Sequence, residues 1–234
     1  MKLPGKTLEK KLLNSGYDQV IGIDEVGMGC LAGPVVVCAV AFNKKFFQLK
    51  DGHSRVNKKL QGVRDSKLLL PHQREKFAIE LLKEKSLRFK IAYCFPKTID
   101  KINIYQAARL AMRRAITRLV YSQESIVHRK KKLLANDHKL KTVVLVDGPH
   151  KIDGLKMEQR AIVKGDQKVF TISCASILAK VFRDKIMVRY AKKFPGYGFE
   201  KHKGYGTKEH LASLTKFGPC AIHRCSFAPV AKLL

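Results

Sequence analysis

The chain has 234 residues and a formal net charge of +28, from 47 lysines and arginines against 19 aspartates and glutamates. Hydrophobic residues make up 45% of the sequence, which excludes global disorder, because disorder requires low hydrophobicity as well as high charge. The longest apolar stretch, residues 30–42, contains a glycine and a proline and is too short to span a bilayer. We therefore expect neither a transmembrane helix nor, given the polar N-terminus, a secretory signal.

The excess of positive charge is the first indication of function. A globular protein with a pI near 10 attracts polyanions over the distance of a Debye length. Nucleic acid is the leading candidate partner, ahead of an anionic membrane surface. The six cysteines include no C-x-x-C pair and fit neither a zinc ribbon nor a small disulfide scaffold. A reduced, cytoplasmic protein is the expectation that follows.

Hydrophobic periodicity predicts an alternation of strands and helices. In chain order, we expect a short polar helix within residues 1–16, strands over 19–24 and 34–42, a basic loop over 43–64, a helix over 71–85 and a strand over 86–94. An amphipathic helix over 104–121 follows, then an exposed basic segment over 122–141 and a strand over 142–146. A short strand over 165–172, a long helix over 173–194 and a short helix over 208–216 complete the prediction. Such an alternation is typical of the α/β class.

The few carboxylates stand at the ends of predicted strands. Asp24 and Glu25 end one buried strand, Asp147 ends another, and Asp166 follows Gly165 just before an apolar segment. Ligand sites of α/β sheets gather beyond the carboxyl ends of strands, so these four side chains are candidates to converge. Mutually repelling carboxylates are stabilised by hard divalent cations such as Mg²⁺. An acidic pocket inside a basic protein is typical of a metal-dependent nuclease, although any one of these aspartates could instead cap a loop.

Eight blocks of the sequence resemble ribonuclease HII of the bacterial type. They are IDEVGMGCLAGPV (23–35), RDSK (64–67), DKINIYQAARLAM (100–112), LVDG (145–148), KGDQK (164–168), ISCASILAKVFRD (172–184), GFEKHKGYGT (198–207) and HRCSFAPV (223–230). The resemblance implies a ribonuclease H-like mixed β-sheet flanked by helices, with a small helical C-terminal segment. On this view residues 1–195 form the catalytic domain, and residues 196–234 form a substrate-binding appendage packed on it.

The resemblance also implies an activity. It implies an endoribonuclease that hydrolyses the RNA strand of RNA/DNA hybrids and cuts on the 5′ side of single ribonucleotides embedded in duplex DNA. The expected products carry 5′-phosphate and 3′-hydroxyl ends, the expected cofactor is Mg²⁺ or Mn²⁺ in a two-metal site, and the expected state is a monomer. The catalytic and metal-binding acids of the family fall on Asp24, Glu25, Asp147 and Asp166. Asp24 is expected to contact both ions, Glu25 and Asp147 to complete one site, and Asp166 to hold the other.

The same resemblance nominates the substrate contacts. Gly27, Met28 and Gly29 correspond to the family's Gly-Arg-Gly turn, whose backbone approaches the ribose 2′-hydroxyl, and here Met28 replaces the arginine and Cys30 the usual proline. Ser66 and Lys67 match a block that contacts phosphate. Tyr205 matches a tyrosine that stacks on the sugar beside the ribonucleotide. Asp184, in the helix, is expected to pair with Lys180.

Two other hypotheses remain open at this stage. The first is a ribonuclease HIII-like enzyme that prefers runs of ribonucleotides, because the Met28 change leaves substrate preference undetermined. The second is a non-catalytic nucleic-acid-binding protein, which the charge alone would favour. The four acids argue against such a protein, because an acidic cluster facing phosphate weakens binding.

Overall fold

The computed structural model describes residues 3–48, 59–131 and 140–234, with the side chains of residues 122–131 excepted. The strands are β1 (Gln19–Val26), β2 (Val35–Phe42), β3 (Leu87–Cys94), β4 (Thr142–Asp147) and β5 (Glu158–Ile162). The main helices are α1 (Thr7–Asn14), α4 (Pro71–Lys83), α6 (Ile104–Lys131), α7 (Phe170–Lys193) and α9 (Lys208–Phe217). Shorter helical segments are α2 (Lys44–Gln48), α5 (Pro96–Ile102), α8 (Phe199–His202), α10 (Ala228–Ala231) and the 3-10 turns Ser66–Leu68 and Gly165–Gln167.

The five strands form one mixed sheet in the order β3-β2-β1-β4-β5. β1 and β2 form an antiparallel pair, as do β2 and β3, whereas β1–β4 and β4–β5 are parallel. In the β1–β4 register, Ile23 lies opposite Val146. The two parallel strands therefore reach their carboxyl ends together, with Asp24 and Asp147 next in line.

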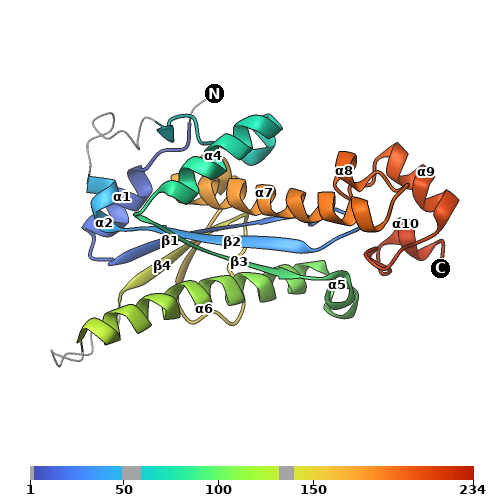
Figure 1. The fold of residues 1–234 in the computed structure, drawn as a ribbon. Helices are drawn as coiled ribbons and strands as arrows, with labels where there is room; N and C mark the ends of the chain where they lie inside the picture. Colours follow the sequence, from blue (N-terminus) through green and yellow to red (C-terminus); the bar gives the residue numbers. More distant parts are fainter. Residues whose placement is uncertain (1–2, 49–58, 132–139) are drawn as a thin grey trace.

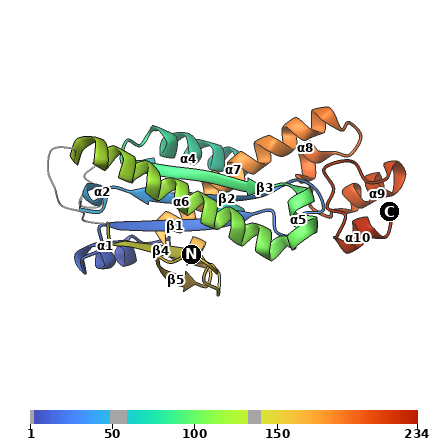
Figure 2. The same ribbon diagram turned by 90° about the horizontal axis from the view of Figure 1, so that it is seen from below.

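Helices cover both faces of the sheet (Figures 1 and 2). On one face α7 packs against β1 and β2, and α4 packs against α7. On the other face α6 crosses β2 and β3. Side chains alternate between the two layers, so that Val20 and Val26 of β1 belong to the core under α7, and Ile21 and Ile23 to the core under α6.

The C-terminal segment lies at one end of the sheet, around the far end of α7 (Figure 1). It has a small core of its own, formed with Met187 of α7 by Tyr197, Phe199 and Ile222. Two fully buried arginines connect this segment with the chain between β1 and β2, as described below. No helix within the described ranges is long and apolar enough to cross a membrane.

Most predicted elements are confirmed, and the exceptions are local. Residues 165–172 were expected to be a strand, which is wrong: they form a 3-10 turn followed by the start of α7. The expected loop over 43–64 contains α2, whose Phe46 and Phe47 are buried, and residues 49–58 lie outside the described residues. The basic segment over 122–141 continues α6 as far as Lys131, with 132–139 outside the described residues. α5 and β5 were not predicted.

Candidate active site

Strand alternation brings two aspartates to one face of the sheet. Asp24 follows Val20 and Gly22 on the α7 side of β1, and Asp147 follows Val143 and Leu145 on the same side of β4. Because β1 and β4 are adjacent and parallel, the two carboxyl groups meet at the same edge.

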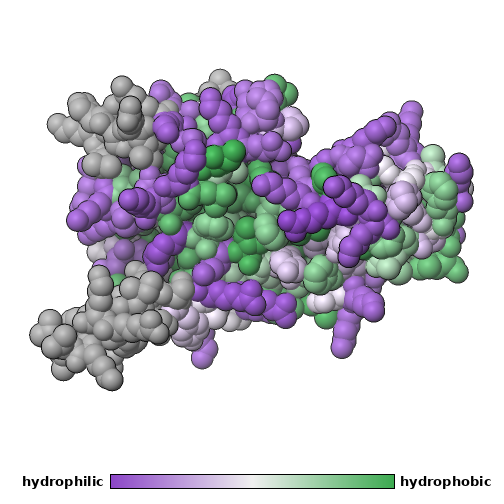
Figure 3. Space-filling view, in the orientation of Figure 1, coloured by the Kyte–Doolittle hydropathy of each residue, from purple (hydrophilic) through white to green (hydrophobic). Residues whose placement is uncertain are grey.

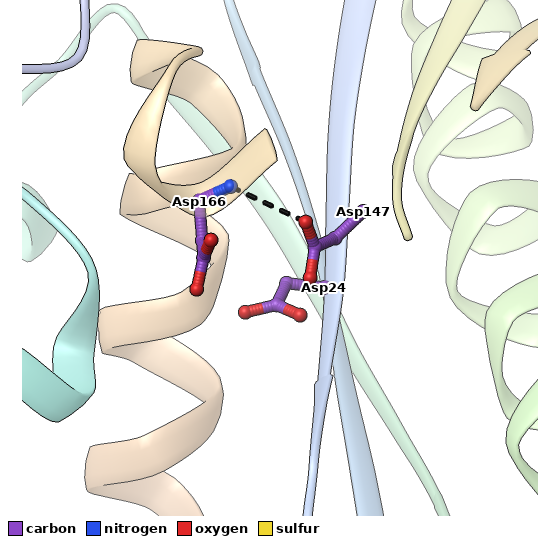
Figure 4. A group of neighbouring side chains, drawn as sticks. All are labelled: Asp24, Asp147 and Asp166. Carbon is purple, nitrogen blue, oxygen red and sulfur yellow. Dashed lines mark hydrogen bonds between the residues drawn. The ribbon is translucent and has the colours of Figure 1, made fainter. Parts of the chain in front are cut away.

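Asp166 reaches this pair from the turn before α7. Gly22 allows the approach, since a Cβ there would lie 2.5–2.6 Å from the backbone of Thr171 and Ile172. The backbone amide of Gly165 donates to Oδ1 of Asp147 over 2.7 Å. The amide of Asp166 donates to the same oxygen over 3.3 Å (Figure 4). The 3-10 turn is thus fastened to the end of β4, and the Asp166 side chain faces the other two.

The three aspartates form a compact acidic group. One carboxylate oxygen from each of Asp24, Asp147 and Asp166 lies within 4.8 Å of the others. Burial, then the charges of Glu25 and Asp147, raise the pKa of Asp24 well above its ordinary value. Burial, then Asp147, raise the pKa of Asp166 to about 6. Without a cation, the side chains of Asp24 and Asp166 resist full ionisation near neutral pH.

Glu25 occupies the other side of the strand. Side chains alternate along β1, so Glu25 points to the same side as Ile21 and Ile23, towards the α6 layer. There it lines a cleft together with Met28 and Asp147. Burial, then the charge of Asp147, raise the pKa of Glu25 to about 7. Its Oε2 atom is buried and has no hydrogen-bond partner among the described residues. Glu25 therefore acts on the acidic group electrostatically, and it is not one of the three residues whose oxygens converge.

These donors fit a divalent metal. Carboxylate oxygens are the ligands that Mg²⁺ and Mn²⁺ prefer. The raised pKa values and the unpartnered Glu25 oxygen indicate negative charge that no described protein group neutralises fully. Asp24, Asp147 and Asp166 are placed to share one ion, and Asp147 extends the acidic surface towards Glu25.

Ser66 and Lys67 lie beside the acidic group. Burial would lower the pKa of Lys67, but the carboxylates of Asp24 and Asp65 outweigh burial and raise it. Ser66 is buried, and its hydroxyl accepts a 2.9 Å hydrogen bond from the hydroxyl of Ser176 of α7. Asp65 was not singled out from the sequence, although it stands in the same RDSK block. It is buried, accepts a hydrogen bond from the Lys67 amide and raises the pKa of Asp166.

Arg224 forms hydrogen bonds with the backbone of the glycine-rich turn at Gly27–Gly29. This side chain is fully buried and donates to the backbone oxygens of Gly27, Met28 and Gly33 over 2.7, 3.0 and 3.1 Å. Arg183 of α7, also fully buried, donates to Ala32, Pro34 and Lys203 in the same way. Neither arginine was selected from sequence, because a charged residue in a basic chain gives no sign that it is buried.

Tyr205 lies next to this turn. It forms an antiparallel bridge with Cys30, and its ring is about one-third exposed. Burial, then the neighbouring Cys30 thiol, raise its pKa to about 12, so the phenol stays protonated. The structure thus brings Met28, Gly29 and Tyr205 to one rim of the site and Ser66 and Lys67 to another.

The expected ion pair of Asp184 is confirmed, and three histidines have structural contacts. Asp184 pairs with Lys180 over 2.8 Å. His202, His210 and His223 are buried and bonded to backbone atoms or to one another, which suits structural roles. All six cysteines are free.

Known proteins match this chain over most of its length. The family model for ribonuclease HII matches residues 21–230. The ribonuclease HII of Caldicellulosiruptor bescii is 47% identical over 220 residues, covering 94% of this chain and 91% of the relative. That of Caldicellulosiruptor saccharolyticus is 43% identical, covering 94% and 92%. The crystal structure of ribonuclease H2 from Pyrococcus horikoshii superposes with a TM-score of 0.62 at 26% identity, covering 92% of this chain and 96% of that one. The expected ribonuclease H-like fold is confirmed.

Proposed function

The chain belongs to the ribonuclease HII family of metal-dependent endoribonucleases, and on that premise we propose its substrates, products and site residues. It hydrolyses the RNA strand of RNA/DNA hybrids and cuts duplex DNA on the 5′ side of a single embedded ribonucleotide. Water adds to phosphorus and the bond to the preceding 3′-oxygen breaks, so the ribonucleotide keeps the 5′-phosphate and the preceding nucleotide gains a 3′-hydroxyl.

The observation that carries this proposal is the acidic group itself. In a protein of net charge +28, three aspartates, two of them buried and one half-buried, share one edge of the sheet within 4.8 Å. A protein that only bound nucleic acid would gain nothing from them, because they repel phosphate. Asp24, Asp147 and Asp166 would hold Mg²⁺ or Mn²⁺, with Glu25 contributing from the other side of β1. When bound, two ions lower the pKa of the attacking water and stabilise the leaving oxygen.

The chain's own residues bind and orient the substrate. The Lys67 ammonium, kept protonated by the neighbouring carboxylates, attracts the phosphate. The Gly27–Gly29 turn, its carbonyls fixed by Arg224, presents its outward backbone to the ribose, whose 2′-hydroxyl distinguishes RNA from DNA. The Tyr205 ring stacks on the adjoining sugar and favours deoxyribose there. Backbone recognition does not need the arginine that Met28 replaces.

A cleavage assay tests the proposal. Duplex DNA with one ribonucleotide and a uniform RNA/DNA hybrid are each incubated with Mg²⁺, Mn²⁺ or EDTA, and the products are resolved on a denaturing gel. We expect a metal-dependent cut 5′ of the single ribonucleotide as well as cleavage of the hybrid. Cleavage of the hybrid alone would favour the ribonuclease HIII-like preference. Binding without cleavage in either metal would overturn the catalytic proposal.

A further inference from the structure

A basic groove adjoins the proposed site on the α4–α7 face of the molecule. It runs between α4 and the outer surface of α7 and ends at α8 and Tyr205. Hydrophilic side chains cover this part of α7 in Figure 3. Its lining includes six cationic side chains but only two carboxylates, those of Glu75 and Asp184. The cations are Arg74, Lys180, Lys185, Arg189, Lys201 and Lys203.

Three cations of α7 line the groove: Lys180, Lys185 and Arg189. Lys185 and Arg189 are four residues apart and therefore lie on the same side of the helix. Lys180 is largely buried and paired with Asp184, whereas Lys185 and Arg189 are exposed. No ion pair joins either of these two to another described residue. From Lys180 to Arg189 the helix rises by about 13 Å. This is about the length of four phosphate steps along one nucleic-acid strand.

Both ends of the groove meet proposed substrate contacts. At one end, Arg74 donates to the backbone oxygen of Ser66 over 2.8 Å. At the other end, Tyr205 lines the groove, and the Lys180 ammonium lies 5.4 Å from the centre of its ring. A strand leaving the acidic group past Tyr205 would therefore enter the groove directly.

We propose that this groove binds the phosphate backbone of the duplex that flanks the cleaved ribonucleotide, on the Tyr205 side, over about four nucleotides. The inference rests on the proposed function and adds a second contact region to it. Lys185 and Arg189 are the main exposed contacts. Because they lie away from the reacting phosphate, they stabilise the bound state and the transition state equally, and they set affinity without changing the chemical step.

The test measures binding, so that it does not depend on cleavage. A fluorescent duplex with one ribonucleotide and flanks of about ten base pairs is titrated with protein in EDTA, between roughly 50 and 200 mM salt. We expect the double variant Lys185→Gln/Arg189→Gln to bind at least about tenfold more weakly and to lower the slope of log Kd against log salt by about 1.8. The charge-preserving Lys185→Arg/Arg189→Lys should bind like the wild type.

The matched control removes the same charge from the same helix. Lys192 and Lys193 are exposed in the last turn of α7 and do not line the groove. Equal losses for Lys192→Gln/Lys193→Gln and the groove variant would mean that only total charge matters, and would overturn the proposal.

Flank length identifies what fills the groove. Shortening one flank to about two base pairs should abolish the difference between the groove variant and the wild type, while shortening the other leaves it, because only one flank spans four phosphate steps in the groove. A loss that is the same for all flank lengths would also overturn the proposal. If the wild type cleaves but the groove variant binds normally, the groove inference alone fails. If the wild type does not cleave, the proposed function fails instead.

Discussion

Burial and three neighbouring carboxylates, those of Glu25, Asp147 and Asp166, raise the pKa of Asp24. Asp24→Asn keeps its shape but removes the charge that holds metal. We expect cleavage to fall by about 10³-fold or more, which corresponds to the loss of roughly 4 kcal/mol of transition-state stabilisation. Hybrid binding in EDTA should be at least as tight as that of the wild type, because one group that repels phosphate is gone. Retained cleavage would contradict the assignment, and a lowered Tm would indicate misfolding instead.

Glu25 gives the metal-free protein a characteristic pH dependence. Its pKa rises from 4.5 to about 7 on folding. Between these values the folded state holds a proton that the unfolded state has released, so stability present below pH 4.5 is lost as pH rises through about 7. The lost free energy of unfolding is about 3 kcal/mol.

Glu25→Gln should remove this contribution. Urea unfolding in EDTA at acidic and mildly alkaline pH should show a smaller decrease for the variant than for the wild type. An identical decrease in both proteins would mean that Glu25 is not a source of the pH dependence.

The fold requires a glycine at position 27 but not at position 29. A Cβ on Gly27 would lie 2.4 Å from Nε of Arg183, at a φ of +93°, so the fold itself requires that glycine. A Cβ on Gly29 would meet nothing within 4 Å. Gly29→Ala should therefore leave Tm within about 2 °C, yet lower kcat/KM on the ribonucleotide substrate by about tenfold, if the ribose packs against this turn. Unchanged kinetics would show that the substrate does not approach Gly29 closely.

At the level of elements, the link between the C-terminal segment and the glycine-rich turn depends on Arg224. Arg224→Met would leave the buried oxygens of Gly27, Met28 and Gly33 without their donors. At about 1 kcal/mol or more for each, the variant should lose at least about 3 kcal/mol, a fall in Tm of roughly 6–12 °C. Thermal unfolding measures this, and Arg160→Met, at a half-exposed position, is the control. Equal Tm values for the two variants would contradict the role of Arg224.

Elements with a clear periodicity could be predicted from the sequence, and those that depend on tertiary contacts could not. Residues 165–172 contain Val169, Phe170 and Ile172, an apolar run that suits a strand or a buried helix equally. The hydrogen bonds from the backbone amides of Gly165 and Asp166 to Asp147 stabilise a turn followed by a helix instead. β5 is polar because it lies at the sheet edge. Asp24 and Asp147 were predictable from strand ends, whereas Asp166 lies in a 3-10 turn. The different direction of the Glu25 side chain follows from its position in the strand alternation.

At the scale of the whole molecule, strong positive charge surrounds a small acidic site. The net charge is +28, while the proposed site consists of three aspartates at one sheet edge, of which Asp24 and Asp166 are buried. Surface lysines and arginines that contact phosphate bind the substrate and the transition state alike, so their contribution appears in affinity and not in turnover. Salt displaces such contacts, and each one changes the slope of log K against log salt by about 0.9.

We therefore expect salt to separate KM from kcat. Between roughly 50 and 200 mM salt, KM for an RNA/DNA hybrid should rise by at least tenfold, the range given by several phosphate contacts. Over the same range kcat at saturating substrate should change by less than about twofold, because the acidic group is buried and screened little by salt. Steady-state kinetics at fixed metal concentration measure both. A kcat that falls in parallel with 1/KM would instead place salt-sensitive contacts in the transition state, close to Lys67 and the aspartates.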